Sequence, residues 1–254
     1  MTKKVLIYQD YGCAHLSPLK KAVERYFLPR GIFVDFTDAA AIKEGALGGD
    51  VVAFFMPGGA GTPFREKLFG PGNKRIRAYV GRGGTYFGIC AGAYYACTET
   101  IFEQGIPELE IMSACGLDLV KGKAIGTLAK QLNILPYSHT GFSSACVQVR
   151  WQDGTLYPSY YSGGPFFKAS DVEVLATYQS EGDPACVIRG HYGQGTVVLC
   201  GVHPEDTGAD VLKSVLPARP DFPQLKKIAK QLEQGENSRH ALFTKIVQAG
   251  MERT

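Results

Sequence analysis

Short apolar runs alternate with amphipathic stretches through the first hundred residues of the chain. Runs of this length, rich in Val, Ile, Phe and Tyr, are typical of strands that are buried on both faces of a sheet. Such runs cover residues 4–8, 32–36, 50–56 and 84–88. Helical patterns separate them, beginning at Ser17 and covering 39–46 and 73–80. This order predicts an α/β fold with a central, mostly parallel sheet, helices on both faces and right-handed crossovers.

The residues around the first helix indicate where it begins and ends. Ser17 is a favoured N-cap residue, and Pro18 suits the first helical position because its missing N–H would have no partner there. Leu19 and Val23 supply part of the apolar stripe, and Gly31 is placed to end the element. We therefore predict a helix that starts with Ser17 as its cap.

The second half of the chain shows a different pattern. Alternating residues at 147–151 and 154–157, with turn residues between them, predict an antiparallel hairpin. Further strands are predicted at 172–178, 185–189 and 196–200, with a turn at 191–195, and helices at 224–234 and 239–251. We expect antiparallel strands to extend the parallel sheet. The whole chain, 1–254, is predicted to be one domain with a C-terminal helical extension from about residue 220.

Composition narrows the class of protein further. The chain has 254 residues, a net charge of +3 and no long block of basic residues, which argues against a nucleic acid partner. No segment is long and apolar enough for a membrane span or a signal peptide, so we expect a cytoplasmic protein without membrane contacts. The seven cysteines are odd in number and lack CxxC spacing. They favour a reducing compartment, and we expect neither a metal site nor another cofactor.

Cys90 has the most informative sequence context. The last predicted strand of the first half leads into Gly88-Ile89-Cys90-Ala91-Gly92, followed by small residues that favour a helix start. A sharp strand-to-helix turn of this kind presents a nucleophile at the carboxyl end of a sheet, where open α/β folds bind ligands. The N-terminus of the following helix is expected to favour the thiolate. The other cysteines are interpreted as structural.

A histidine and an acid follow the predicted strand at 196–200. His203 and Glu205 flank Pro204, which restricts the histidine to an extended backbone. A thiol nucleophile needs a base, and the base needs a partner that fixes its tautomer. We therefore predict Cys90 as nucleophile, His203 as base and Glu205 as its orienting group. The remaining histidines, which are His15, His139, His191 and His240, are interpreted as solvated or structural.

Glycine-rich segments supply candidates for the rest of the site. Backbone N–H groups usually hold the oxyanion of acyl transfer, and one commonly comes from the residue after the nucleophile. This predicts Ala91 and, from the turn after residues 50–56, Gly59, with Gly58 beside it. The aromatic segment at 160–167 either lines the substrate pocket or forms a structural turn. Its candidate substrate-binding residues are Tyr161, Gly163 and Gly164, to which Gly58 and Tyr94 are added.

The order of these motifs resembles class I glutamine amidotransferases. It is most similar to the amidotransferase-like family at the N-terminus of biotin–protein ligases. The matching segments are Pro57-Gly58-Gly59-Ala60, Phe87 to Tyr94, Tyr161 to Phe166, Leu175 to Tyr178 and His203-Pro204-Glu205. The resemblance implies a flavodoxin-like sheet and a Cys-His-Glu triad. Glutamine-specific members usually carry Gln four residues after the nucleophile, where this chain has Tyr94.

These observations lead to a ranked set of functional hypotheses. The first is a cysteine-dependent amidase or hydrolase that acts on the carbon–nitrogen bond of a small amide or on another acyl substrate, alone or with a separate synthase or ligase subunit. The second is a binding or regulatory module that keeps the fold without catalysis. The third is a redox or carbonyl-scavenging protein, which the His203–Glu205 pair disfavours.

Overall fold

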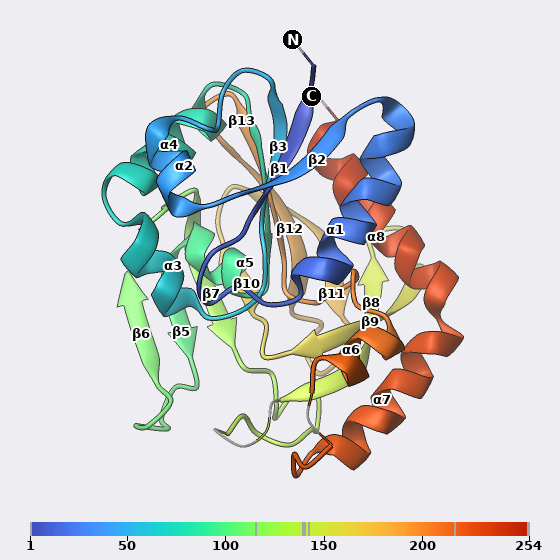
Figure 1. Cartoon of the computed structure of the whole chain (residues 1–254). Coiled ribbons are helices and arrows are strands. Elements are labelled where there is room, and N and C mark those ends of the chain that lie inside the picture. Colours follow the sequence, from blue (N-terminus) through green and yellow to red (C-terminus); the bar gives the residue numbers. More distant parts are fainter. Residues whose placement is uncertain (1, 115, 139–140, 142, 216, 253–254) are drawn as a thin grey trace.

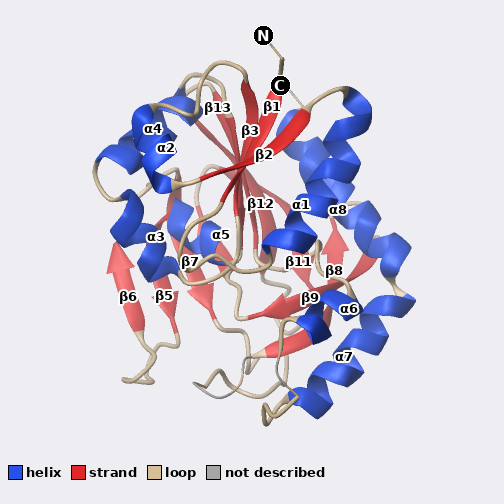
Figure 2. Cartoon of the chain, in the orientation of Figure 1, coloured by secondary structure: helices blue, strands red, loops and turns tan. Residues whose placement is uncertain are grey.

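The computed structural model describes residues 2–114, 116–138, 141, 143–215 and 217–252. Within them, thirteen strands form one continuous sheet with helices on its faces (Figures 1 and 2). The parallel half of this sheet contains β1 (Lys4–Tyr8), β2 (Phe33–Thr37), β3 (Val51–Met56), β4 (Thr85–Ile89) and β13 (Gly195–Cys200). These strands are parallel and have the order β2-β1-β3-β4-β13. This is the strand order of flavodoxin-like folds, so the predicted fold class is confirmed.

Helices cover both faces of the parallel strands. One face carries α1 (Leu16–Phe27) and α8 (Glu236–Met251), and the other carries α2 (Ala39–Glu44), α3 (Gly61–Leu68) and α4 (Pro71–Gly81) (Figure 1). The short 3-10 helix η1 (Leu28–Arg30) follows α1.

Alternation along each strand distributes the apolar side chains between two cores. In β1, Val5 and Ile7 belong to the core under α1 and α8, whereas Leu6 and Tyr8 belong to the core under α2, α3 and α4. All four side chains are buried. A strand with helices above and below it must be apolar on both sides, which explains the continuous apolar run in the sequence.

The second half of the chain extends the sheet beyond β13 with mainly antiparallel pairing. β12 (Ala185–Tyr192), β10 (Phe166–Ala169), β7 (Val120–Gly126), β5 (Cys97–Phe102) and β6 (Ile111–Ala114) follow in that order. A branch of β11 (Val172–Tyr178), β8 (Ser144–Trp151) and β9 (Leu156–Ser162) pairs with β12 through β11. The predicted hairpin is the β8–β9 pair, and the expected antiparallel extension is confirmed.

The last third of the chain also contributes helices around the β8–β9 hairpin. α6 (Gly208–Lys213) and α7 (Phe222–Gln234) share a small apolar core with Tyr160 of β9. α8 instead packs on the main sheet through Leu242, Phe243 and Ile246. In the described part of the chain, no helix combines the length and the apolar character needed to cross a membrane.

Two local predictions were wrong. His15, rather than Ser17, is the N-cap residue of α1, because the carbonyl of His15 already accepts the Leu19 N–H at 3.0 Å. The turn between β12 and β13 contains only Gly193 and Gln194, because β12 pairs with β13 as far as Tyr192. His191 therefore lies in a strand.

Candidate active site

Cys90 lies at the junction of β4 and α5 (Ala91–Ala96) with φ 48° and ψ −106°. Residues with a side chain rarely adopt this backbone conformation. The flanking glycines make the sharp turn possible. A Cβ on Gly88 would lie 2.6 Å from the carbonyl oxygen of Gly92, and one on Gly92 would lie 2.2 Å from that of Met56. The helix can therefore lie directly against β3 and β4 only with glycine at both positions.

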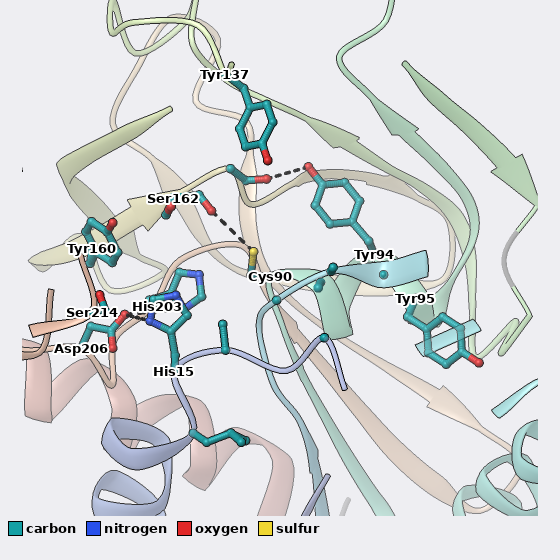
Figure 3. Close-up of a pocket in the computed structure, with 18 of the residues that line it drawn as sticks. His15, Cys90, Tyr94, Tyr95, Tyr137, Tyr160, Ser162, His203, Asp206 and Ser214 are labelled. Carbon is teal, nitrogen blue, oxygen red and sulfur yellow. Dashed lines mark hydrogen bonds and ion pairs between the residues drawn. The ribbon is translucent and has the colours of Figure 1, made fainter. Parts of the chain in front are cut away.

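A cavity of about 830 Å³ opens beside Cys90. Its walls come from the loop after β1, the loop after β3, α5, β9 and the loop after β13. Figure 3 shows Cys90 between two groups of side chains, with Tyr94 and Tyr137 on one side and His15, His203 and Asp206 on the other. The volume is within the range of small-molecule sites. Parallel strands that end at one edge of the sheet bring these loops together.

His203 and Cys90 approach each other at Gly58. A Cβ on Gly58 would lie 2.6 Å from Cε1 of His203 and 3.5 Å from Cβ of Cys90, so a larger residue would occupy the space between them. The His203 side chain is buried, and its backbone N–H donates to the carbonyl of Tyr160 at 2.7 Å. This bond fixes the loop after β13 to β9.

Glu205 holds the imidazole of His203 from behind. Nδ1 of His203 lies 2.8 Å from Oε1 of Glu205, and both side chains are buried. Glu205 does not line the cavity, whereas His203 does. In its ionised form the Glu205 carboxylate only accepts hydrogen bonds, so Nδ1 of His203 then donates and Nε2 is the acceptor nitrogen of the ring. Burial raises the pKa of Glu205 to about 7.

Both partners of the candidate nucleophile–base pair are uncharged at neutral pH. Burial raises the pKa of the Cys90 thiol to about 12, although the N–H groups of Ala91 and Gly59 act to lower it. Burial and the nearby charge of His15 lower the pKa of His203 to about 3. The N-terminus of α5 acts in the expected direction, because the Ala91 N–H lowers the pKa of the thiol, but desolvation outweighs it. The thiol lies 3.6 Å from the carbonyl oxygen of Ser162, as a donor to it.

The backbone N–H groups of Gly59 and Ala91 both donate to the Cys90 sulfur. Ala91 is the first residue of α5, where an N–H has no partner within the helix. Gly59 lies opposite Cys13 in an isolated β-bridge. The hydrogen bonds of this bridge run from the N–H groups of Ala14 and Ala60 to the carbonyls of Gly58 and Gly12. Gly59 has a φ of +134°, and a Cβ there would lie 2.0 Å from the carbonyl oxygen of Gly12.

The predicted substrate-binding residues fall into two groups. Tyr94 and Gly163 line the cavity, and the Tyr94 hydroxyl donates to the Gly163 carbonyl at 3.1 Å. Gly58, Tyr161 and Gly164 do not line it. The Tyr161 hydroxyl is buried, where it accepts from the Leu128 N–H and donates to the Gly164 carbonyl.

Alternation along β9 explains which of its residues face the cavity. Tyr160 and Ser162 line it, and Tyr161 between them points to the core on the opposite side. The sequence could have distinguished the cavity-facing residues from Tyr161 if this segment had been interpreted as a strand, because successive side chains of a strand point to opposite faces.

His15, like its partner Asp206, is a cavity residue that sequence reasoning missed. Its Nδ1 lies 2.6 Å from Oδ2 of the buried Asp206, and its ring centroid lies 4.4 Å from that of His203. The other histidines are in different places. His191 is exposed on β12, His240 lies 3.8 Å from Glu236 on α8, and His139 is outside the described residues. No local pattern around His15 identifies it, because its partners lie near the other end of the chain.

Within the described residues, His15, His203 and Asp206 are the side chains that could together hold a metal ion. Their potential ligand atoms lie within 4.8 Å of one another. The 2.6 Å contact between His15 and Asp206 is the distance of a charge-assisted hydrogen bond. We therefore describe the cluster as an ion pair beside a second imidazole.

Sequence comparisons match almost the whole chain. A family model described as "Biotin-protein ligase, N terminal" matches residues 3–252. An uncharacterized protein of Chlamydia muridarum is 34% identical over 158 residues, which are 59% of each chain. A biotin–protein ligase of Schizosaccharomyces pombe is 26% identical over 79% of this chain and 33% of its own length. The chain thus spans less than two thirds of either relative.

Solved structures share the fold at low sequence identity. PurLQS from Thermotoga maritima superposes with a TM-score of 0.57 at 16% identity, over 98% of this chain and 99% of that one. A glutamine amidotransferase from the same organism gives 0.54 at 14% identity, over 99% of both chains. These similarities show an amidotransferase-like fold.

Proposed function

Because the chain belongs to the biotin–protein ligase N-terminal family and has an amidotransferase-like fold, we propose that it is a cysteine-dependent amidase or hydrolase. The observation that carries the proposal is the convergence at Cys90. The imidazole of His203 and the side chain of Cys90 both lie against Gly58, and the N–H groups of Gly59 and Ala91 act on the sulfur, beside a cavity large enough for a substrate. Each group has a role in acyl transfer to a cysteine.

The proposed reaction has two halves. The sulfur of Cys90 attacks the substrate carbonyl while Nε2 of His203 takes the thiol proton. The resulting tetrahedral oxyanion accepts hydrogen bonds from the N–H groups of Gly59 and Ala91. His203 then gives its proton to the leaving amine, the carbon–nitrogen bond breaks and a thioester remains. Water, deprotonated by His203, attacks the thioester and releases a carboxylic acid and the thiol.

Glu205 and the resting charge state determine how this reaction starts. Glu205 keeps Nδ1 protonated, so Nε2 is the nitrogen available to the thiol. Since both Cys90 and His203 are uncharged, the proton must move as the sulfur attacks. The site therefore differs from one that holds a preformed thiolate.

The cavity favours an amide or acyl substrate other than free glutamine. Tyr94 occupies the place of the glutamine-contacting Gln in the resembled enzymes, and its ring lies against Phe102. Tyr95, Tyr137 and Tyr160 add aromatic surface, which suits a substrate with an apolar part. A separate ligase or synthase subunit that receives the product is part of this proposal, because one relative is a longer biotin–protein ligase.

A non-catalytic binding module is the second candidate. The observation that favours it is the buried, protonated thiol, whose pKa of about 12 does not match that of a typical reactive cysteine. Such a module would bind a small molecule in the same cavity without forming a covalent bond to Cys90.

Acylation by a small activated ester separates the two candidates. We expect p-nitrophenyl acetate to give a burst of nitrophenol and a mass increase on Cys90. Cys90→Ala should abolish the burst, and His203→Gln should slow it on the order of 100-fold, the scale of lost general-base catalysis. Cys146→Ala is the matched control, because this thiol is half-buried and lies outside the cavity. An equal burst from Cys90→Ala would rule out the enzyme, and so would the absence of acylation in the folded wild type.

A further inference from the structure

We propose that His15 and Asp206 form a second imidazole–carboxylate pair of this site, in which the positive charge of His15 adds to burial in disfavouring protonation of the adjacent His203. This inference rests on the proposed function, because it assigns His15 a role toward His203. It makes His15 a positioning residue, since its ring contacts His203 and the charge acts through that ring on Cys90.

The imidazole of His15 lies between Asp206 and the ring of His203. The residue caps α1 in a left-handed conformation, with φ 58°, which turns its side chain toward the loop after β13. Its Nδ1 lies 2.6 Å from Oδ2 of Asp206, a carboxylate that is 1% exposed. The same oxygen lies 4.0 Å from Nδ1 of His203. The two imidazole rings face each other at 4.4 Å with a 36° tilt.

The surrounding charges favour a protonated His15. Burial acts to lower the pKa of His15, but the hydrogen bond and charge of Asp206 outweigh it and raise the pKa. The titratable and charged groups that face His15 are Asp206, Glu205, Asp210, His203 and Tyr160. Buried Arg239 on α8 acts on Glu205 and Asp206 from another side. His15 is thus the cation next to His203 in a group of carboxylates.

A fixed positive charge beside the base has a chemical use. During attack His203 becomes an imidazolium next to a second imidazolium, and the repulsion makes it a stronger acid. The proton of His203 is then transferred more readily to the leaving amine. His15 itself gains and loses no proton in this cycle, so the reaction balance given above is unchanged.

Histidine titration by NMR tests the inference without a substrate. The chain has five histidines, so ¹⁵N-histidine labelling gives a spectrum that single His→Gln variants can assign. In the wild type we expect His15 to be protonated and His203 neutral at pH 6. His15→Gln should raise the midpoint of His203 by about one pH unit or more, the effect of one neighbouring charge. His15→Lys keeps the charge and should retain the low midpoint. Asp206→Asn should lower the midpoint of His15.

Controls separate a charge effect from a loss of structure. His191→Gln removes an exposed histidine far along β12 and should leave the His203 midpoint unchanged. Equal His203 midpoints in the wild type and a folded His15→Gln variant would overturn the inference, and so would a neutral His15 in the wild type at pH 6.

Ester acylation distinguishes failure of this inference from failure of the proposed function. In His15→Gln the acid limb of the Cys90 burst should move to higher pH, whereas a purely structural loss would lower the burst at every pH. A shifted His203 midpoint without any Cys90 acylation would reject the enzyme and leave the ion pair intact. Acylation with an unshifted midpoint would reject the role of His15 alone.

Discussion

Gly58 and Gly59 are adjacent, yet each leaves space for a different part of the site. At Gly58 the missing Cβ makes room for the imidazole of His203. At Gly59 it makes room for the loop after β1, whose Gly12 carbonyl would otherwise be in contact at 2.0 Å. Gly59 also has a φ of +134°, a conformation open mainly to glycine. Two neighbouring glycines thus determine the approach of the base and the direction of a backbone donor.

Replacement of Gly59 by Ala should therefore destabilise the protein. The backbone strain and the contact with the Gly12 carbonyl together should lower the free energy of unfolding by about 2 kcal/mol or more. Gly61→Ala is the matched control, since a Cβ there meets nothing within 4 Å and Gly61 is the first residue of α3. Urea unfolding of both variants measures the difference. Equal stability of the two would show that the loop after β1 moves freely.

His203 gives the protein a specific dependence of stability on pH. Its pKa is about 3 in the folded chain and about 6.5 when unfolded. Below pH 6.5 the unfolded chain binds a proton that the folded chain does not bind. The contribution of His203 to the free energy of unfolding should therefore fall as the pH decreases from 6.5 toward 3. In urea unfolding, the free energy of unfolding of the wild type minus that of His203→Gln should decrease from pH 7 to pH 5. His191→Gln serves as control, and a decrease equal in all three proteins would contradict the prediction.

At the scale of elements, a strand was predictable where its own composition is rich in apolar residues. β1 and β11 have the predicted bounds, because their apolar residues are prominent in the sequence. β5, β6, β7 and β10 were not predicted. β7 has the sequence VKGKAIG, in which exposed lysines alternate with buried residues. β6 exposes Ile111 and Met112 at the edge of the sheet. Such strands are defined by their neighbours more than by their own composition.

α8 stabilises the folded chain through the side chains that it packs against the sheet. Phe243 is 4% exposed, and its ring stacks on that of Phe55 with centroids 6.5 Å apart. Phe243→Ala should lower the free energy of unfolding by about 3–5 kcal/mol, because it leaves a cavity between helix and sheet. Gln248→Ala on the exposed side of the same helix should change it by less than about 0.5 kcal/mol. A small effect at Phe243 would mean that α8 does not stabilise the sheet.

At the scale of the whole molecule, one sheet connects both halves of the chain. β13, from the last third, pairs with β4 in the parallel centre, and β12 continues into the antiparallel half. α8 packs on β4, β9, β12 and β13. These long-range pairings support our proposal that the chain is one domain and that its C-terminal helices belong to the core.

A single unfolding transition is the expected consequence. Trp151, the only tryptophan of the chain, lies in β8 of the antiparallel branch, so its fluorescence reports on that half. Far-UV circular dichroism reports on the whole chain. The two signals should give the same midpoint in thermal or urea unfolding. Two separate midpoints would indicate two independent domains.

The sequence by itself determined the alternation of strands and helices, the fold class and the segments that carry candidate reactive side chains. Cys90, with its flanking glycines, and the pair His203 and Glu205 are local motifs, because each depends on residues a few positions apart. A strand-to-helix turn and an extended His-x-Glu segment can both be predicted from local backbone preferences.

Only the tertiary structure decided what surrounds those motifs. His15 meets Asp206 because the loops after β1 and β13 end at the same edge of the sheet. The register of β9 places Tyr160 and Ser162, and not Tyr161, in the cavity. Burial makes Cys90 a neutral thiol, against the local effect of the helix N-terminus. Distances between remote segments and the loss of solvent around a group arise from packing of the whole chain, so no local pattern records them.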